Sequence, residues 1–126
     1  MPEKKLNATI RQASPFANVI DIQGEISSFS DDTLMKAYEA ATATNARTVI
    51  LNFSEMTYLN SVGIAMLVRL LLRAQREGKK MAGYGLADHF KRVFEITQLD
   101  HVIPIRDSES VALAFCEPFD LPDRED

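Results

Sequence analysis

The chain lacks several features on which common protein functions depend. It has no tryptophan, one cysteine and two histidines among its 126 residues. The one cysteine, Cys116, excludes a disulfide within the chain. Neither His89 nor His101 lies at metal-ligand spacing from it. We therefore expect neither a bound metal nor any other cofactor.

Long uninterrupted hydrophobic runs are also missing. The longest apolar helical segment contains Arg69, Arg73 and Arg76, so its composition is not that of a membrane span. The first residues lack the basic start and apolar core of a signal peptide. The sequence thus predicts a cytoplasmic protein that does not bind a membrane.

The chain has fewer basic than acidic residues. The chain has 14 Lys and Arg against 18 Asp and Glu, a net charge of −4 and a pI near 5.2. This balance argues against a basic surface for phosphate backbones, and hence against direct recognition of nucleic acid. Any effect on transcription is expected to pass through a protein.

A recognisable catalytic serine motif is absent as well. Ser61 could be combined with His89 and with Asp88 or Asp100 into a Ser-His-Asp arrangement. However, Ser61 does not lie in a Gly-x-Ser-x-Gly turn, and only the start of a helix could serve as an oxyanion hole. We expect no enzymatic activity.

What the sequence does contain is an alternation of strand and helix patterns. After two strands at 6–12 and 17–24, helices expected to begin near Ser30, Ser61, Asp88 and Asp107 alternate with strands at 48–53, at 80–85 and shortly before Asp107. Such alternation predicts a single α/β domain with a mixed sheet of four or five strands and about four helices, packed mainly on one face. The domain is expected to span 1–116. Residues 117–126 hold two prolines and five acidic residues and are expected to form a flexible tail.

The junction between the strand pattern and the second helix carries the clearest functional signal. Ile64, Leu67, Val68, Leu71 and Leu72 form the expected core-facing stripe, so Ser61 lies at or next to the N-cap. A serine there has a structural explanation, since its oxygen caps the helix for roughly 1 kcal/mol. It also has a functional one, since a helix N-terminus accommodates an anion such as phosphate.

The outward face of the same helix is predicted to be a contact surface. Helical spacing puts Val62, Met66, Arg69 and Arg73 opposite the core stripe. Apolar side chains on this face, Val62 and Met66 with Leu70 as a further candidate, would form a small patch rimmed by the arginines, with Ser61 at its edge. The alternative is incidental exposure.

Four segments together resemble the STAS domain family of bacterial anti-sigma factor antagonists. The segment 58–64, Tyr-Leu-Asn-Ser-Val-Gly-Ile, is similar to the family's signature loop, and 22–26, Ile-Gln-Gly-Glu-Ile, to the end of its second strand. The segment 90–100 is similar to its third helix and the turn after it, and 102–105 to its last short strand. The resemblance covers roughly residues 6 to 115, in order and at family spacing.

The resemblance implies a partner-switching protein in signal transduction that regulates transcription. It implies that Ser61 is the phosphoacceptor of an anti-sigma factor of the serine-kinase type, with an ATPase fold, and that a serine phosphatase reverses the modification. The protein itself would be a monomer or weak dimer. The implied contact residues are Glu25, Ser27, Ser28, Asn60, Val62, Met66 and Arg69.

Two positions depart from the family pattern. Asn60 and Ser27 stand where many antagonists carry Asp, which removes negative charge from the surface that the resemblance turns toward the partner. This keeps an alternative open: a constitutive STAS interaction or scaffold module that is not phosphorylated and does not act on a sigma factor. A third reading, a small-molecule or nucleotide sensor, requires a pocket.

Overall fold

The computed structural model describes residues 6–116. Its elements follow in the order β1 Leu6–Ser14, β2 Ala17–Ile26, α1 Asp31–Ala41, β3 Thr48–Leu59, α2 Ser61–Arg76, β4 Lys80–Tyr84, α3 Asp88–Ile96, a 3₁₀ turn η1 Leu99–His101, β5 Ile105–Arg106 and α4 Glu109–Cys116. The predicted α/β alternation is confirmed. Residues 117–126, the predicted tail, lie outside the described residues.

The strands form one mixed sheet in the order β1-β2-β3-β4-β5. β1 pairs with β2 in antiparallel fashion, whereas the pairs from β2 to β5 are parallel. The parallel pairs require crossover connections, which α1, α2 and α3 supply. The carboxyl ends of β2 to β5 therefore meet at one edge of the sheet, where the connections to the helices begin.

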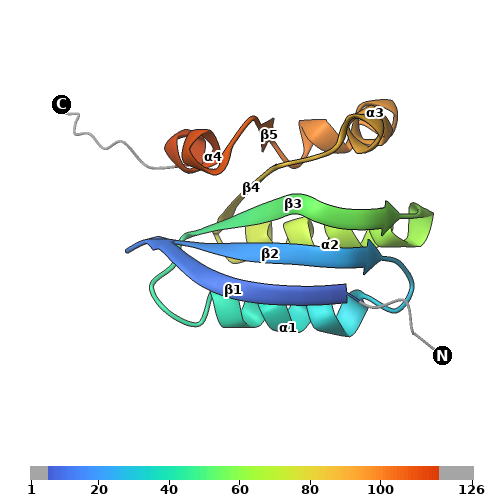
Figure 1. The fold of residues 1–126 in the computed structure, drawn as a ribbon. Helices are drawn as coiled ribbons and strands as arrows, with labels where there is room; N and C mark the ends of the chain where they lie inside the picture. The colour runs from blue at the N-terminus through green and yellow to red at the C-terminus, as the bar shows by residue number, and fades with distance from the viewer. Residues whose placement is uncertain (1–5, 117–126) are drawn as a thin grey trace.

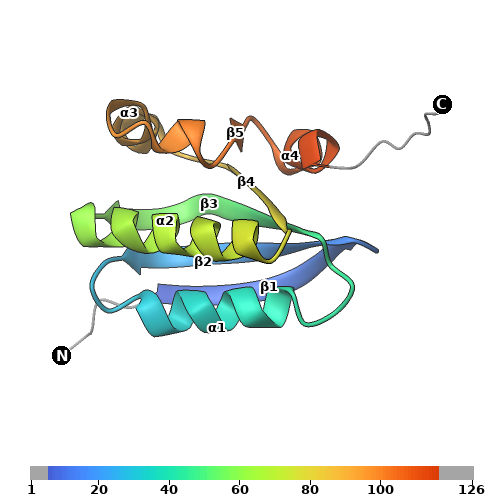
Figure 2. The same ribbon diagram turned by 180° about the vertical axis from the view of Figure 1, so that it is seen from behind.

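The helices cover the two faces of the sheet unequally. α1 and α2 lie side by side on one face (Figures 1 and 2), and their apolar side chains share a core with Phe90 and Phe94 of α3. α4 lies on the opposite face, where Ala112 and Cys116 pack against Val19, Ile50 and Ala82. Packing mainly on one face is thus confirmed.

The first half of the central strand β3, residues 48–53, is mostly apolar because both faces of the sheet are covered there. Val49, Leu51 and Phe53 belong to the large core beneath α1 and α2, whereas Ile50 between them belongs to the small core beneath α4. Because successive side chains of a strand point to opposite faces, a strand covered on both sides must be apolar at every position. The edge of Phe94 meets the ring of Phe53, with centroids 5.7 Å apart.

A polar network ties α4 to the far edge of the sheet. The Arg11 guanidinium donates to Asp21 at 2.6 and 3.1 Å and to Glu109 at 2.6 and 3.2 Å. These hydrogen bonds hold the pKa of both carboxyl groups below its usual range. Tyr84 donates to Glu109 at 2.9 Å, and burial together with this bond raises its pKa to about 12.

Several predicted boundaries are wrong by a few residues. β3 continues to Leu59 because it stays paired with the end of β2. Ala87 rather than Asp88 is the N-cap of α3, and the Asp88 carboxylate makes no capping hydrogen bond. α4 begins at Glu109 because the hydroxyl of Ser108, not Asp107, accepts a hydrogen bond from the first turn, from the Val111 N–H at 3.3 Å. Within residues 6–116, no helix has the length and hydrophobicity needed to span a membrane.

Candidate interaction site around Ser61

The site is built where the carboxyl ends of β2 and β3 lie side by side. Glu25 pairs with Tyr58 and Ile26 with Leu59 across the two parallel strands, whose arrowheads point to the same end of the molecule (Figure 1). The chain leaves β2 through a short loop into α1 and leaves β3 through Asn60 into α2. Two helix N-termini therefore lie at this edge of the sheet.

Asn60, not Ser61, caps α2. Asn60 has extended backbone angles, and its side-chain oxygen accepts a hydrogen bond from the Gly63 N–H at 2.9 Å. Its carbonyl oxygen accepts the first helical hydrogen bond, from the Ile64 N–H at 2.9 Å. An asparagine is among the best residues for this role, which contributes about 1 kcal/mol.

Ser61 is the first residue of α2, and its side chain is exposed. Within residues 6–116, the Ser61 hydroxyl has no hydrogen-bond partner. The structural explanation for this serine, helix capping, is therefore already met by its neighbour. A hydroxyl that is exposed and makes no structural bond is available to an enzyme that modifies it.

The loop between β2 and α1 is held in shape by a buried serine. The Ser30 hydroxyl accepts a hydrogen bond from the Ser27 N–H at 2.8 Å and donates to the Glu25 carbonyl oxygen at 3.0 Å. Ser30 is thus the N-cap residue of α1, as predicted, but its side chain caps no helical N–H. It fixes the turn that presents Ser28 and Phe29 to solvent.

Three large side chains at this edge are unusually exposed for their type. Phe29 is 80% exposed, Tyr58 45% and Val62 44%. An open hollow of about 320 Å³ lies at this edge, lined by Glu25, Ser27, Ser28, Phe29, Tyr58 and Asn60. We call Ser28, Phe29, Tyr58, Ser61 and Val62 the Ser61 surface. Exposed apolar side chains gathered beside polar groups are typical of protein–protein contact sites.

Two residues of α2 that were predicted to be exposed contacts are buried, so this prediction is wrong. Met66 is 7% exposed and the further candidate Leu70 is fully buried, whereas Leu72, predicted to face the core, is 47% exposed. The helix is rotated relative to the predicted orientation because Gly63, which has no side chain, lies against β2. Its buried face consists of Gly63, Met66, Leu67, Leu70, Leu71 and Ala74.

Four of the other predicted contact residues lie near Ser61 and are accessible, whereas Ser27 is buried. Glu25, Ser28, Asn60 and Val62 do come together at the Ser61 surface or its hollow. Ser27 lines the hollow but is only 6% exposed, because its backbone is engaged by Ser30.

The predicted arginine rim lies against α1. Arg69 is exposed, two turns further along α2, and forms an ion pair with Asp31 at the start of α1 at 3.5 Å. Arg73 pairs with Glu39 and Glu77. Both arginines therefore join the two helices and do not surround Val62.

Sequence reasoning missed Phe29 and Tyr58 as contact candidates. Phe29 stands alone among serines in Ser27–Ser28–Phe29–Ser30, and an aromatic residue in a short polar loop has no core position to fill. That was a usable signal for Phe29. The sequence contained no such signal for Tyr58, because the residue pattern of β3 does not show where the strand leaves the core.

Metal chemistry has no basis in the part of the chain from 6 to 116, since no three His, Cys, Asp or Glu side chains gather there as a metal site. The edge around Ser61 carries instead exposed apolar side chains beside exposed hydroxyl groups.

Comparison with known proteins identifies the family. The family model described as "Mlab, STAS domain" matches residues 10–106. The anti-sigma-B factor antagonist of Listeria monocytogenes is 26% identical over 90 residues, which are 71% of this chain and 79% of the relative.

Solved structures agree on the fold. An anti-sigma factor antagonist from Mycobacterium paratuberculosis superposes with a TM-score of 0.77 at 18% identity, covering 91% of this chain and 97% of that one. SpoIIAA, an anti-sigma factor antagonist described as a Bacillus cell fate determinant, gives a TM-score of 0.68 unphosphorylated (14% identity; 86% and 96% covered) and 0.64 phosphorylated (14%; 88% and 100%). The fold and the family match agree, and the chain belongs to the STAS domain family.

Proposed function

We propose that this protein is an anti-sigma factor antagonist, a regulatory binding protein without catalytic activity of its own. In its unphosphorylated form it binds a cognate anti-sigma factor of the serine-kinase type through the Ser61 surface, and so releases a sigma factor. The kinase phosphorylates Ser61 with ATP and Mg²⁺, and a separate serine phosphatase reverses the modification. The protein acts in the cytoplasm as a monomer or weak dimer.

Relatives support the general class of this function. The curated Listeria protein is named an antagonist of an anti-sigma factor. SpoIIAA carries the same name and has been solved in a phosphorylated and an unphosphorylated form. A protein of this fold therefore exists in both forms, and the present chain has an exposed serine at the start of α2.

The observation that carries the proposal is that Asn60, and not its neighbour Ser61, caps α2. Asn60 satisfies the Gly63 N–H, which leaves the exposed Ser61 hydroxyl without a structural task. Ser61 also directly precedes Val62, one of the exposed apolar residues at this edge. A group attached to Ser61 would thus alter the contact surface without removing a capping bond.

The physical effect of phosphorylation follows from charge and hydration. A phosphoserine adds about −1.5 to −2 charges at neutral pH. At the start of α2 the helix dipole favours that charge, so the fold tolerates it. A docked partner would have to strip water from the phosphate, and any acidic group facing it would repel it, which costs several kcal/mol. This is enough to change a tight complex into a weak one.

The test is a capture experiment from the native lysate with wild-type protein and the Ser61→Asp variant. Bound proteins and the modification of Ser61 are identified by mass spectrometry. The proposal requires that wild type, but not Ser61→Asp, recovers a kinase with an ATPase fold, and that phosphate is found on Ser61 of the wild type. The Ser61→Ala variant is the matched control, because it should bind the same kinase and carry no phosphate.

One observation favours a second candidate, a constitutive STAS interaction module. Asn60 is neutral where many family members carry Asp, and the adjacent hollow lacks a second acidic side chain at Ser27. Equal recovery of a different partner by wild type and Ser61→Asp, with Ser61 unmodified, would support this module and contradict the phosphorylation switch.

A further inference from the structure

A second hollow, unrelated to Ser61, lies at the carboxyl ends of β4 and β5. These strands are parallel and in register, with Gly83 opposite Ile105 and Tyr84 opposite Arg106. The hollow opens between the connections that follow the two strands and has a volume of about 290 Å³. In sheets with parallel strands, this edge is where ligands bind. The volume, near the lower limit of roughly 300 Å³ for ligand sites, suits only a small molecule.

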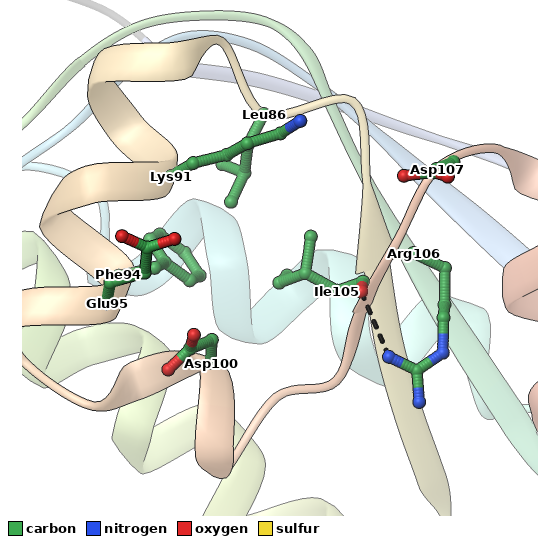
Figure 3. A pocket seen from close by; sticks show the side chains of 8 residues that line it. All are labelled: Leu86, Lys91, Phe94, Glu95, Asp100, Ile105, Arg106 and Asp107. Atoms are coloured by element: carbon green, nitrogen blue, oxygen red, sulfur yellow. Dashed lines mark hydrogen bonds between the residues drawn. The ribbon is translucent and has the colours of Figure 1, made fainter.

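The lining combines apolar and charged side chains (Figure 3). Leu86, Phe94 and Ile105 form the apolar part. The charged side chains are Lys91, Glu95, Asp100, Arg106 and Asp107. Glu95 and Asp100 lie on the same side of the hollow, whereas the Lys91 ammonium lies at another point of its rim (Figure 3).

Two of the charged side chains around this hollow, Lys91 and Glu95, are unpaired in the described part of the chain. Arg11, Arg69 and Arg73 all form ion pairs with carboxylates. No ion pair or hydrogen bond within residues 6–116 includes the side chains of Lys91 or Glu95.

Asp100 carries a carboxylate oxygen that can accept a further hydrogen bond. Its Oδ1 atom is buried and has no hydrogen-bond partner among the described residues, and the His101 Nε2 atom is 4.0 Å from it. A buried carboxylate oxygen without a donor costs free energy. A ligand that donates a hydrogen bond there would remove that cost.

The Arg106 guanidinium is already engaged by the protein. Its Nη1 donates to the Ile105 carbonyl oxygen at 3.0 Å, and its guanidinium lies 4.0 Å from the centroid of the Phe115 ring. The groups left to meet a ligand are thus one ammonium and three carboxylates.

We propose that this hollow binds a free amino acid, with its ammonium group between Glu95 and Asp100 and its carboxylate at Lys91. An amine without a carboxylate would face the Lys91 ammonium, and an acid without an amine would face two carboxylates. Only a zwitterion matches both ends. The hydrocarbon part of the ligand lies against Leu86 and Ile105. The site is independent of the Ser61 surface.

The test is titration of the methyl-labelled protein with the proteinogenic L-amino acids, followed by NMR of Leu86 and Ile105. For L-leucine, the probes also include isoamylamine, which lacks the carboxylate, and isocaproate, which lacks the amine. We expect saturable shifts of these methyl groups with at least one amino acid, and at least about tenfold weaker binding of both analogues, or about 1.4 kcal/mol.

Variants separate binding from folding. Asp100→Asn and Lys91→Met should each weaken binding by about tenfold or more, whereas Asp88→Asn and Arg92→Met, on the same helix or its start but outside the hollow, should bind like wild type. If Asp100→Asn does not fold, the exposed Glu95→Gln takes its place. The proposal is overturned if no amino acid shifts the methyl signals, if the analogues bind equally well, or if the hollow variants retain wild-type affinity.

Discussion

Gly63 lies directly against the backbone of Ile26. A Cβ added to Gly63 would overlap the Ile26 carbonyl oxygen and would lie 2.8 Å from its carbonyl carbon and 2.9 Å from its Cγ2. This close approach joins the start of α2 to the end of β2. It also sets the rotation of α2 and thereby the exposure of Ser61 and Val62.

Gly63→Ala should therefore destabilise the protein strongly. The clash is with backbone, which cannot move as a flexible side chain can, so we expect a loss of about 2–3 kcal/mol in the free energy of unfolding. Urea denaturation measures it. Ala65→Gly, two residues along the exposed side of the same helix, is the control and should cost only about 1 kcal/mol through helix propensity. A Gly63→Ala variant as stable as wild type would show that the contact does not fix α2.

The capping assignment makes a separate prediction for Asn60. Asn60→Ala removes the acceptor for the Gly63 N–H and should cost about 1 kcal/mol, whereas Asn60→Asp keeps the acceptor and should retain stability. Ser61→Ala should leave the melting temperature nearly unchanged. A larger loss from Ser61→Ala than from Asn60→Ala would contradict the assignment and return the capping role to Ser61.

The exposed aromatic residue in the β2–α1 loop allows binding to be tested apart from stability. Because Phe29 is 80% exposed, Phe29→Ala should leave the free energy of unfolding within about 0.5 kcal/mol of wild type. If Phe29 is a contact centre, the variant should lose about 2 kcal/mol of partner affinity, measured by calorimetry with the captured partner.

A matched control lies at the opposite end of β2. Phe16 is 49% exposed and directly precedes the strand, so Phe16→Ala removes a similar exposed ring away from the Ser61 surface. Its affinity should equal that of wild type. Equal affinity of Phe29→Ala would remove Phe29 from the interface.

The Arg11 network predicts a pH-dependent loss of stability. Arg11 lowers the pKa of Asp21 and Glu109, so the network contributes stability above their usual values of about 4 and loses it as the pH falls through the lowered values. Arg11→Met should cost about 1 kcal/mol at neutral pH, since Arg11 is partly exposed. The difference from wild type should shrink in strong acid.

Urea denaturation across the acidic range measures this difference. Arg92→Met is the control, because Arg92 is exposed on α3 and forms no ion pair within residues 6–116; its effect should not depend on pH. A deficit of Arg11→Met that stays constant down to low pH would show that the carboxylates do not depend on Arg11.

The sequence was sufficient for the fold and for the serine, and insufficient for the orientation of the helix that carries it. Alternating patterns and family motifs predicted a mixed sheet of four or five strands, which has five, and the start of α2. However, nearly every residue from Val62 to Leu72 is apolar, so hydrophobicity alone could not determine which side faces the core. Only the tertiary contact between Gly63 and Ile26 does so, and this is why Met66 was wrongly expected on the surface.

Local sequence was equally insufficient for the loop. Ser27 reads as an exposed polar residue, but its N–H is bound by the Ser30 hydroxyl and the residue is buried. The same turn exposes Phe29, which hydrophobicity would assign to the core. Side-chain burial in a short loop depends on hydrogen bonds between residues three positions apart, which a residue pattern does not reveal.

The most direct test of the central claim is the affinity of the captured kinase for unmodified protein and for protein phosphorylated on Ser61. We predict that phosphorylation weakens binding at least about a hundredfold, equivalent to about 2.8 kcal/mol, while the Ser61→Ala variant, incubated with kinase and ATP, keeps the affinity of the unmodified protein. Equal affinities of the two forms, or phosphate incorporated into Ser61→Ala as readily as into wild type, would contradict a switch at Ser61.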